Sequence, residues 1–276
     1  MQTQAQRGEA FRALHQRDGL LILPNPWDAG SAKILAALGF EALATTSAGL
    51  AFSLGRPDAE GQVSRDECLD NARAIVEATT LPVAADLENG YGDDPESCAE
   101  TIALAARIGL VGGSIEDANG QAASPIYPLE LAVERIQAAV AAARSLPFTF
   151  TLAARAENYL HGRCDLDDTI RRLVAYAEAG ADVLYAPGLT TREEIAAVVS
   201  AVAPRPVNVL VGSPALTLSL PELAALGVKR VSLGSCMARA AYGAFYDAAQ
   251  ALATRGSLAE VGQAMPFATL NDLFKR

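Results

Sequence analysis

The chain has little histidine and little cysteine, and each shortage excludes a kind of site. Of its 276 residues, two are histidine and four are cysteine. The cysteines lie far apart in the sequence, without the paired spacing of a zinc site or the density of a disulfide-rich secreted protein. The histidines, His15 and His161, are too few for a histidine-rich metal centre.

Positive charge and long apolar runs are also scarce. Lys and Arg total 22 against 32 for Asp and Glu, a net charge of −10, which disfavours nucleic acid and anionic membranes as partners. No uninterrupted apolar run can span a bilayer, and the polar residues 1–16 lack the apolar core of a signal peptide. We therefore expect a cytoplasmic protein that binds neither nucleic acid nor membrane. An anionic small substrate stays compatible, because a local arginine or metal can reverse the field in one pocket.

The hydrophobic pattern predicts an α/β protein. Eight apolar, strand-like runs recur, and each is followed by an alanine-rich segment with helical spacing. This alternation favours a parallel sheet covered by helices, and eight repeats at this length favour a (β/α)₈ TIM-type barrel. The first run is not followed by G-x-G-x-x-G, which weakens a Rossmann fold. The predicted strands are residues 20–24, 42–47, 82–88, 110–116, 148–155, 182–186, 207–211 and 230–233.

We find no linker or low-complexity segment, so we expect residues 1–276 to form a single domain. Residues 257–276 follow the last repeat as a C-terminal helical tail, with a helix at 257–263 and a break at Pro266. Such a tail packs on its own barrel or on a partner subunit, and the sequence leaves both open. The predicted barrel helices are residues 29–38, 65–77, 95–108, 129–143, 167–179, 192–199, 221–226 and 237–251.

Acidic side chains gather at the carboxyl ends of the predicted strands, where the active sites of parallel barrels lie. Asp86 and Glu88 end the third strand and share one face, because strand side chains alternate. Glu116 ends the fourth strand. Carboxylates that converge in this way repel one another unless a cation lies between them, and hard oxygen ligands suit Mg²⁺. The alternative is a solvated strand end whose charges face water.

Two further features at these strand ends suit an anion. The segment Thr46-Ser47-Ala48-Gly49 has no bulky side chain, so its backbone N–H groups can reach an anionic ligand. Arg155, at the end of the fifth strand, can hold a carboxylate through two parallel hydrogen bonds. Plainer explanations are a tight strand exit for the loop, and an ion pair of Arg155 with Glu116 or Glu157.

In their order along the chain, these motifs resemble the isocitrate lyase/phosphoenolpyruvate mutase superfamily, from the first predicted strand to the eighth helix. The resemblance implies a (β/α)₈ barrel whose last helix is commonly exchanged between subunits. It also implies an enzyme that binds Mg²⁺ and a 2-oxo acid or its enolate, and makes or breaks a C–C or P–C bond. The motifs are Asn25-Pro-Trp27-Asp-Ala-Gly-Ser, the 45–50 loop with Pro57-Asp58, Asp86-x-Glu88-x-Gly90-Tyr91-Gly92, Ile115-Glu116-Asp117, Ala154-Arg155 and Asn208.

By this resemblance, Asp86 binds Mg²⁺ directly, while Glu88 and Glu116 hold its water ligands, with Mn²⁺ as an alternative metal. Catalytic roles fall to Glu116, to Arg155 at the oxo-acid end, and to Asp58 as an acid that lines the site. Tyr185 and Asn208 lie where members of the family differ in substrate choice. The substrate-binding residues that the resemblance implies are Thr46, Ser47, Ala48, Asp86, Arg155, Tyr185 and Asn208.

One loop departs from the family pattern. Lyases of the family carry Lys-x-Cys-Gly-His after the fourth strand, with the Cys as general acid/base, and the mutase has a Lys and an Asn there. Here residues 117–127 form a shorter segment without Cys, Lys or His, and Asn119 matches the mutase poorly. The enolate-stabilising half of the site remains, and this half suffices for oxaloacetate decarboxylation or a retro-aldol cleavage.

We therefore expect a Mg²⁺-dependent carbon–carbon lyase, similar to isocitrate lyase or to an oxaloacetate decarboxylase. Its substrate would be a small 2-oxo or 2-hydroxy di- or tricarboxylate that reacts through an enolate. The alternatives are a P–C bond enzyme acting on phosphonopyruvate and a barrel that binds 2-oxo acids with little catalysis. Tyr127, His161 or a neighbouring subunit's tail is a candidate to replace the missing Cys. The resemblance further implies a homodimer or homotetramer.

Overall fold

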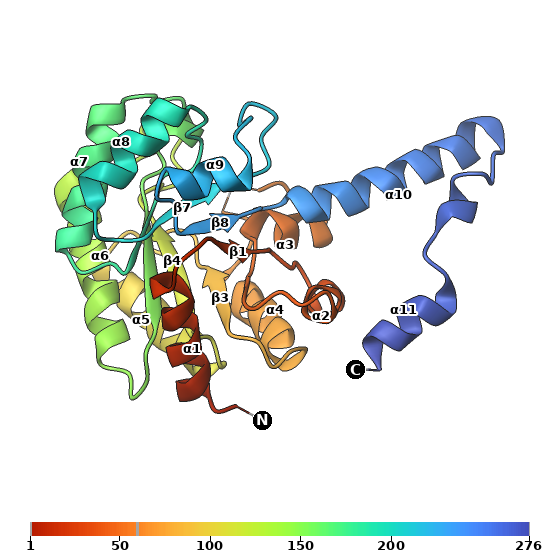
Figure 1. Ribbon diagram of the computed structural model, residues 1–276, viewed down its shortest axis with the longest axis horizontal. Coiled ribbons are helices and arrows are strands. Elements are labelled where there is room, and N and C mark those ends of the chain that lie inside the picture. Colours follow the sequence, from red (N-terminus) through yellow and green to blue (C-terminus); the bar gives the residue numbers. More distant parts are fainter. Residues whose placement is uncertain (1, 59–60, 276) are drawn as a thin grey trace.

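The computed structural model describes residues 2–58 and 61–275 and confirms the predicted barrel. Its eight parallel strands form one sheet in the order β1-β8-β7-β6-β5-β4-β3-β2, with helices around it (Figure 1). Every predicted strand is present, shortened at its ends. The strands are β1 (Leu21–Leu23), β2 (Leu43–Ala44), β3 (Val83–Asp86), β4 (Gly112–Glu116), β5 (Thr151–Arg155), β6 (Val183–Tyr185), β7 (Val207–Leu210) and β8 (Arg230–Ser232).

The eight predicted barrel helices are also present, with ends shifted by a few residues. They are α2 (Ala29–Ala37), α4 (Arg65–Glu77), α5 (Pro95–Arg107), α6 (Leu129–Arg144), α7 (Leu166–Glu178), α8 (Arg192–Val202), α9 (Leu220–Ala225) and α10 (Cys236–Arg255). Several begin at a capping box, in which a Ser, Thr or Asp side chain and the third helical residue satisfy each other's backbone N–H groups.

Two helices were not predicted, and one prediction in the tail was wrong. The additional helices are α1 (Gln4–Gln16) and α3 (Ser47–Ser53), while α11 (Phe267–Phe274) lies in the predicted helical tail. The helix expected at 257–263 is instead a turn followed by a short 3₁₀ helix, η2 (Val261–Gln263). Helix α1 escaped prediction because a single short face of it is apolar, and α3 because its first residues suit a tight loop equally well.

The gap between β1 and β2 is bridged by single hydrogen bonds rather than by a ladder. Ala44 N donates to Pro24 O at 3.1 Å. The buried Asn25 side chain donates to Thr45 O at 3.0 Å and accepts from Leu233 N and Gly234 N at 2.8 and 3.0 Å. One amide thus joins the chain at the ends of β1, β2 and β8, where the cavity described below opens.

Helix α1 closes the opposite end of the barrel. Phe11 is fully buried against Leu21, Leu23 and Ala84 on the inner face of the sheet. Gly8 lets the helix approach β5, because a Cβ atom at this position would lie 2.3 Å from Thr149 O. The barrel is therefore sealed at the amino ends of its strands and open at their carboxyl ends.

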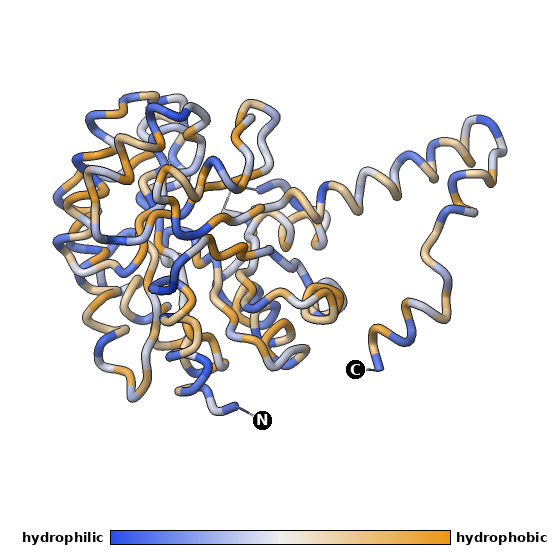
Figure 2. Tube along the Cα trace, in the orientation of Figure 1, coloured by the Kyte–Doolittle hydropathy of each residue, from blue (hydrophilic) through white to orange (hydrophobic). Residues whose placement is uncertain are grey.

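The end of the chain projects from the barrel as an arm, residues 236–275. Along α10, Ala238 and Ala251 are buried, while much of the helix extends away from the sheet (Figure 1). Helix α11 returns to α2, where Lys33 Nζ donates to Phe274 O at 2.9 Å. Apolar stretches recur along the whole arm (Figure 2). Its exposed large apolar side chains are Met237, Tyr242, Phe245, Tyr246, Leu252, Leu258, Val261, Met265, Phe267 and Phe274.

None of the helices in the described residues combines the length and the apolar character needed to cross a bilayer.

The contact of α1 with β5 gives a stability prediction. We expect Gly8→Ala to lower the free energy of unfolding by about 1–3 kcal/mol, because the added methyl forces α1 away from Thr149. Gly30→Ala is the matched control, since a Cβ atom there meets its nearest neighbour at 3.5 Å. In the control, the better helix propensity of alanine should raise stability by up to about 1 kcal/mol. Equal effects in urea unfolding would contradict the close approach of α1.

Candidate active site

A cavity of about 220 Å³ opens at the carboxyl ends of the strands and reaches into the barrel. It is smaller than pockets for drug-sized ligands, which measure roughly 300–1,000 Å³. A small organic acid is therefore the size of ligand that it suits. The polar residues that line it are Asn25, Thr45, Thr46, Ser47, Asp58, Asp86, Ser114, Arg155, Tyr185, Arg230, Ser232 and Ser235.

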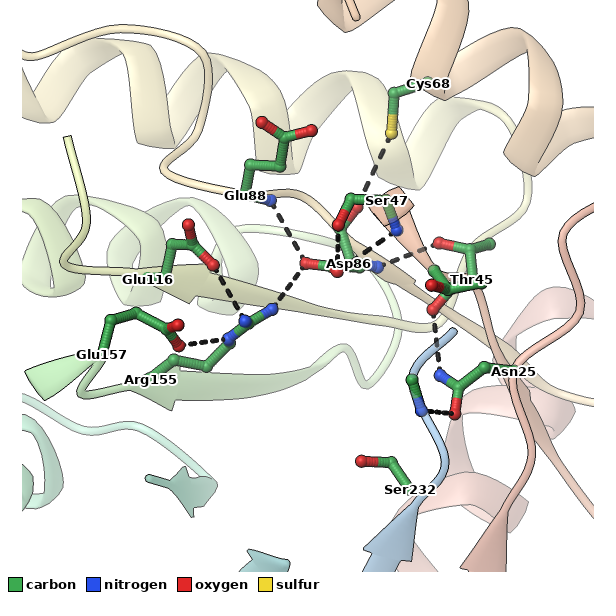
Figure 3. Close-up of polar contacts among 12 residues, drawn as sticks. Asn25, Thr45, Ser47, Cys68, Asp86, Glu88, Glu116, Arg155, Glu157 and Ser232 are labelled. Atoms are coloured by element: carbon green, nitrogen blue, oxygen red, sulfur yellow. Dashed lines mark hydrogen bonds and ion pairs between the residues drawn. The ribbon is translucent and has the colours of Figure 1, made fainter. Parts of the chain in front are cut away.

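Arg155 is the centre of the site. Its guanidinium contacts three carboxylates: Asp86 Oδ1 at 2.8 Å, Glu116 Oε2 at 3.0 Å and Glu157 Oε1 at 2.8 Å (Figure 3). The side chains come from β3, from β4 and from just beyond β5, so strand order brings them together. Tyr185 lies beside the guanidinium, with its ring centroid 5.2 Å from Arg155 Cζ. Both ion pairs that were the plainer explanation for Arg155 are present, and Asp86 adds a third.

One guanidinium does not balance three largely buried carboxylates. Burial raises the pKa of Glu116 well above its usual range against the attraction of Arg155, and repulsion from Glu157 adds to the rise. Burial likewise raises the pKa of Glu157. The surrounding acids in turn hold the pKa of Arg155 well above its usual value against the effect of burial. The site therefore favours either an extra proton or an extra cation.

Asp86 is the one acid of the group whose pKa lies below its usual value. Burial alone would raise its pKa, but Arg155 and hydrogen bonds from Ser47 lower it below the usual value. Ser47 donates to Asp86 Oδ2 through its hydroxyl at 2.9 Å and its backbone N–H at 3.3 Å. The Asp86 backbone N–H donates to Thr45 Oγ1 at 3.0 Å. Both oxygens of the carboxylate are thus fixed in position.

Glu88 takes a different direction from Asp86. Its backbone has φ 47°, a left-handed conformation that costs of the order of 1–3 kcal/mol for a residue other than glycine. Its carboxylate points away from Arg155 (Figure 3) and lines a neighbouring depression with Ser64 and Asn89. Burial, then repulsion from Asp86 and Asp58, raises the pKa of Glu88 to about 7. Glu88 therefore combines a strained backbone with a raised pKa, and such perturbed residues cluster at functional sites.

Arg135 fixes the turn that follows Glu88. This buried side chain on α6 donates to the backbone oxygens of Asn89 and Gly92, the latter at 2.7 Å. It also stacks on Tyr127, with Arg135 Cζ 4.3 Å from the ring centroid. The Tyr127 hydroxyl donates to Asp93 at 2.5 Å. Tyr127 is therefore committed to holding the turn, and neither it nor His161 lines the cavity.

The predicted anion-binding loop is the first turn of α3. Thr46 caps this helix by accepting from Gly49 N at 3.2 Å. A Cβ atom at Gly49 would lie 2.9 Å from Trp27 Cβ, so glycine allows α3 to lie against this residue. The segment was predicted to be a loop and is instead the start of a helix, but it does line the cavity. The Ser47 N–H group already serves Asp86 in this structure.

A buried polar network between the end of β4 and α7 supports the site. Asp117 accepts from Glu157 N at 2.8 Å, from Tyr176 OH at 2.6 Å and from Arg172 Nη1 at 3.1 Å. Arg172 also pairs with Asp168 at 2.9 Å. Because Asp117 holds the backbone of Glu157, this network sets the position of one of the acids around Arg155.

The residues present fit a magnesium ion held largely through water. In residues 2–58 and 61–275, no three Asp, Glu, His or Cys side chains converge closely enough to hold a metal by themselves. Mg²⁺ commonly keeps several waters and uses one or two carboxylates. The site offers oxygen ligands and an excess of negative charge, with Asp86 as an anion. Asp86 would hold the ion, and Glu88 and Glu116 would hold its waters.

The structure places the sequence-predicted residues at two depths. Thr46, Ser47, Ala48, Asp58, Asp86, Arg155 and Tyr185 line the cavity, while Glu116 pairs with Arg155 and Glu88 lines the neighbouring depression. Asn208 is buried in the wall, where it donates to Ser232 Oγ at 2.9 Å and accepts from Arg230 Nε at 2.8 Å. Sequence reasoning missed Arg230 and Ser232, because a charged residue at the start of a strand usually faces solvent.

Comparison with known proteins gives consistent matches over most of the chain. A family model described as phosphoenolpyruvate phosphomutase matches residues 11–253. A crystal structure of a provisionally assigned lyase/mutase from Burkholderia cenocepacia J2315 is 61% identical, with a TM-score of 0.95 over 99% of this chain and 97% of that chain. An oxaloacetate decarboxylase of Bradyrhizobium diazoefficiens is 31% identical over 254 residues, 89% of this chain and 85% of the relative. The structure of oxaloacetate acetylhydrolase with its product oxalate is 28% identical, with a TM-score of 0.87 over 99% of this chain and 95% of that chain.

The network between Asp117 and α7 predicts unequal effects for two adjacent arginines. We expect Arg172→Met to lower the free energy of unfolding by about 3–5 kcal/mol, because Asp117 loses its buried partner. Arg171→Met is the matched control, since Arg171 also pairs with Asp168 but is largely exposed. The control should change stability by about 0.5 kcal/mol or less. Urea denaturation followed by circular dichroism measures both, and similar losses would refute the role of the buried network.

Proposed function

The chain belongs to the phosphoenolpyruvate phosphomutase family, within the isocitrate lyase/phosphoenolpyruvate mutase superfamily, and we propose that it is a Mg²⁺-dependent carbon–carbon lyase. Its substrate class is a small 2-oxo or 2-hydroxy carboxylate with a second acidic group. The observation that carries the proposal is the buried Arg155 surrounded by Asp86, Glu116 and Glu157 at the mouth of a small polar cavity. The assembly has too few cations for its carboxylates and faces the space where a substrate would lie.

The protein groups divide the work of binding and charge stabilisation. Arg155 offers a fixed, permanently charged donor group for the 2-oxo acid, since a guanidinium stays protonated at any working pH. The first turn of α3 offers backbone N–H groups at the cavity wall. When bound near Asp86, the metal would supply positive charge that stabilises an enolate oxygen. The positions of Arg155 and Asp86 are set before the substrate arrives, which lowers the reorganisation cost of the reaction.

A four-carbon substrate is supported by size and by relatives. The cavity of about 220 Å³ suits a short acid better than a large one. The decarboxylase and the acetylhydrolase that match this chain are both named for oxaloacetate. We infer that oxaloacetate or a close analogue is the substrate to test first, with methylisocitrate and dimethylmalate as larger candidates.

Chemistry at a P–C bond is the second candidate, and the family description favours it. The loop after β4 argues against it. Asn119 donates through its side chain to Ser124 O at 2.7 Å and accepts from Gln121 N at 2.8 Å. Its backbone N–H donates to Pro125 O at 2.8 Å. The amide is thus used inside the loop, which leaves it unsuited to hold a transferring phosphoryl group.

We further propose that the protein is a homodimer or homotetramer built through the arm, residues 236–275. The arm exposes Phe245 at 72%, Tyr246 at 61% and Phe267 at 85% of their surfaces. Soluble monomers rarely leave so much contiguous apolar surface in water. A second copy of the chain would cover this surface. We also propose that the protein is cytoplasmic.

Measurements of substrate turnover test the proposed role of the metal. We expect the protein with Mg²⁺ to cleave one member of a panel of oxaloacetate, isocitrate, 2-methylisocitrate, dimethylmalate and phosphonopyruvate, and EDTA to abolish the reaction. Asp86→Asn should lower kcat/KM on the order of 100-fold or more, because it removes the anion that faces the metal. The control Asp70→Asn makes the same charge change on an exposed face of α4. Turnover that survives both EDTA and Asp86→Asn would contradict the proposal, and binding without turnover would favour the weak-catalyst alternative.

The molecular mass of the protein in solution tests whether the arm forms the subunit interface. We expect light scattering after size exclusion to give a dimer or tetramer for the native protein and a smaller species for Phe245→Glu combined with Phe267→Glu. The acidic side chains would oppose burial of the apolar arm. Leu38→Glu is the control, because Leu38 is 70% exposed but lies outside the arm. A monomeric native protein, or an unchanged mass in the double variant, would overturn this assembly.

A further inference from the structure

Arg230 is a buried cation deep in the barrel that the proposed chemistry has not used. It is 6% exposed and lines the cavity. It is the first residue of β8, whereas Arg155 is the last residue of β5. The guanidinium of Arg230 lies beside His15 of α1, the helix that closes the amino ends of the strands, whereas that of Arg155 lies with Asp86 and Glu116 at their carboxyl ends. The cavity therefore has a cation near its mouth and another at its floor.

No carboxylate neutralises Arg230. Across the described parts of the chain, no Asp or Glu lies within ion-pair distance of its guanidinium. Its contacts are neutral: Nε donates to Asn208 Oδ1 at 2.8 Å, and Nη1 lies 3.4 Å from His15 Nε2. A buried charge without a counter-ion is expensive, and natural proteins rarely keep one unless it has a ligand.

The side chains next to Arg230 are neutral, so they do not compensate its charge. His15 Nδ1 lies 2.8 Å from Phe11 O, so this nitrogen carries the proton and Nε2 is the acceptor that faces Arg230. Burial lowers the pKa of His15 to about 4, so the ring is neutral at pH 7. Burial raises the pKa of Tyr185 to about 12, so this phenol is neutral as well. Asp86, Glu116 and Glu157 all lie with Arg155.

Small residues leave the space above Arg230 open. Ala44, Ala84, Gly113, Ser114 and Ala153 line the cavity that also contains both arginines, and Leu23 and Leu210 are the larger apolar residues of its inner wall. In most barrels of this kind, branched side chains fill the interior in layers. Here, an anion that enters past Arg155 has a path to the guanidinium of Arg230.

We propose that Arg230 binds the second anionic group of the substrate, at the end remote from Arg155. The substrate class is then a 2-oxo or 2-hydroxy acid with a further carboxylate or phosphonate, and a monocarboxylate is a poor ligand. This inference rests on the proposed function, which supplies the site for the first carboxylate. Arg230 thereby sets specificity, while Arg155 and Asp86 serve the reacting end.

Two stable four-carbon probes test the assignment by calorimetry in the presence of Mg²⁺. L-Malate and 2-hydroxybutyrate share a skeleton and differ in one terminal group, a carboxylate in the first and a methyl in the second. We expect the native protein to bind malate about 10–100-fold more tightly, the range for a charge-assisted hydrogen bond. Arg230→Gln should abolish this preference by weakening malate alone, while Arg230→Lys should keep part of it. Competition by oxaloacetate and by phosphonopyruvate then distinguishes a carboxylate from a phosphonate as the natural second group.

The control is Lys229→Gln, which makes the same charge change one residue earlier, where Lys229 Nζ lies 3.5 Å from Arg17 O on the surface. It should retain the preference for malate. The melting temperature of ligand-free Arg230→Gln should stay level or rise, because an uncompensated buried charge is removed, whereas a structural role would lower it. An unchanged malate preference in Arg230→Gln, an equal loss for both probes, or no preference in the native protein would overturn the proposal. None of these readings needs turnover, so failure of the lyase assignment is seen separately, as silence across the substrate panel.

Discussion

The site depends on a single buried guanidinium that three carboxylates share. Arg155 can balance one of Asp86, Glu116 and Glu157 in full, and the remaining negative charge has to be met by a proton or by another cation. The protein settles this by holding Asp86 as an anion with Ser47, while burial raises the pKa values of Glu116 and Glu157. The proposed metal and the proposed substrate class both follow from this imbalance.

The barrel holds the charged groups around Arg155 in fixed positions. Helix α1 seals the amino ends of the strands, Asn25 joins the chain across the gap between β1 and β2, and Arg135 holds the turn after Glu88. Each of these contacts lies outside the reacting centre, yet each sets the position of a group that lines it. This arrangement costs free energy at two residues: Glu88 has a left-handed backbone, and Arg230 is a buried charge without a counter-ion.

The sequence allowed the barrel and the Asp86–Arg155 half of the site to be predicted, because strand alternation and the position of polar residues at strand ends are local patterns. It did not reveal α1 and α3, whose few apolar contacts depend on the closed barrel. It also did not reveal Arg230, since the inward direction of a strand residue depends on register with Asn208 and Leu21. Asn208 was expected at the substrate and instead holds Arg230, a relation that spacing cannot show.

The most direct test of this account is a titration of the protein with Mn²⁺, followed by the electron paramagnetic resonance signal of the free ion. The account predicts one bound Mn²⁺ per chain, displaced by Mg²⁺, held more tightly when oxalate is present, and lost in Asp86→Asn. Absence of binding, or binding that is indifferent to Asp86, would contradict the claim that the excess carboxylate charge around Arg155 is there to receive a divalent cation.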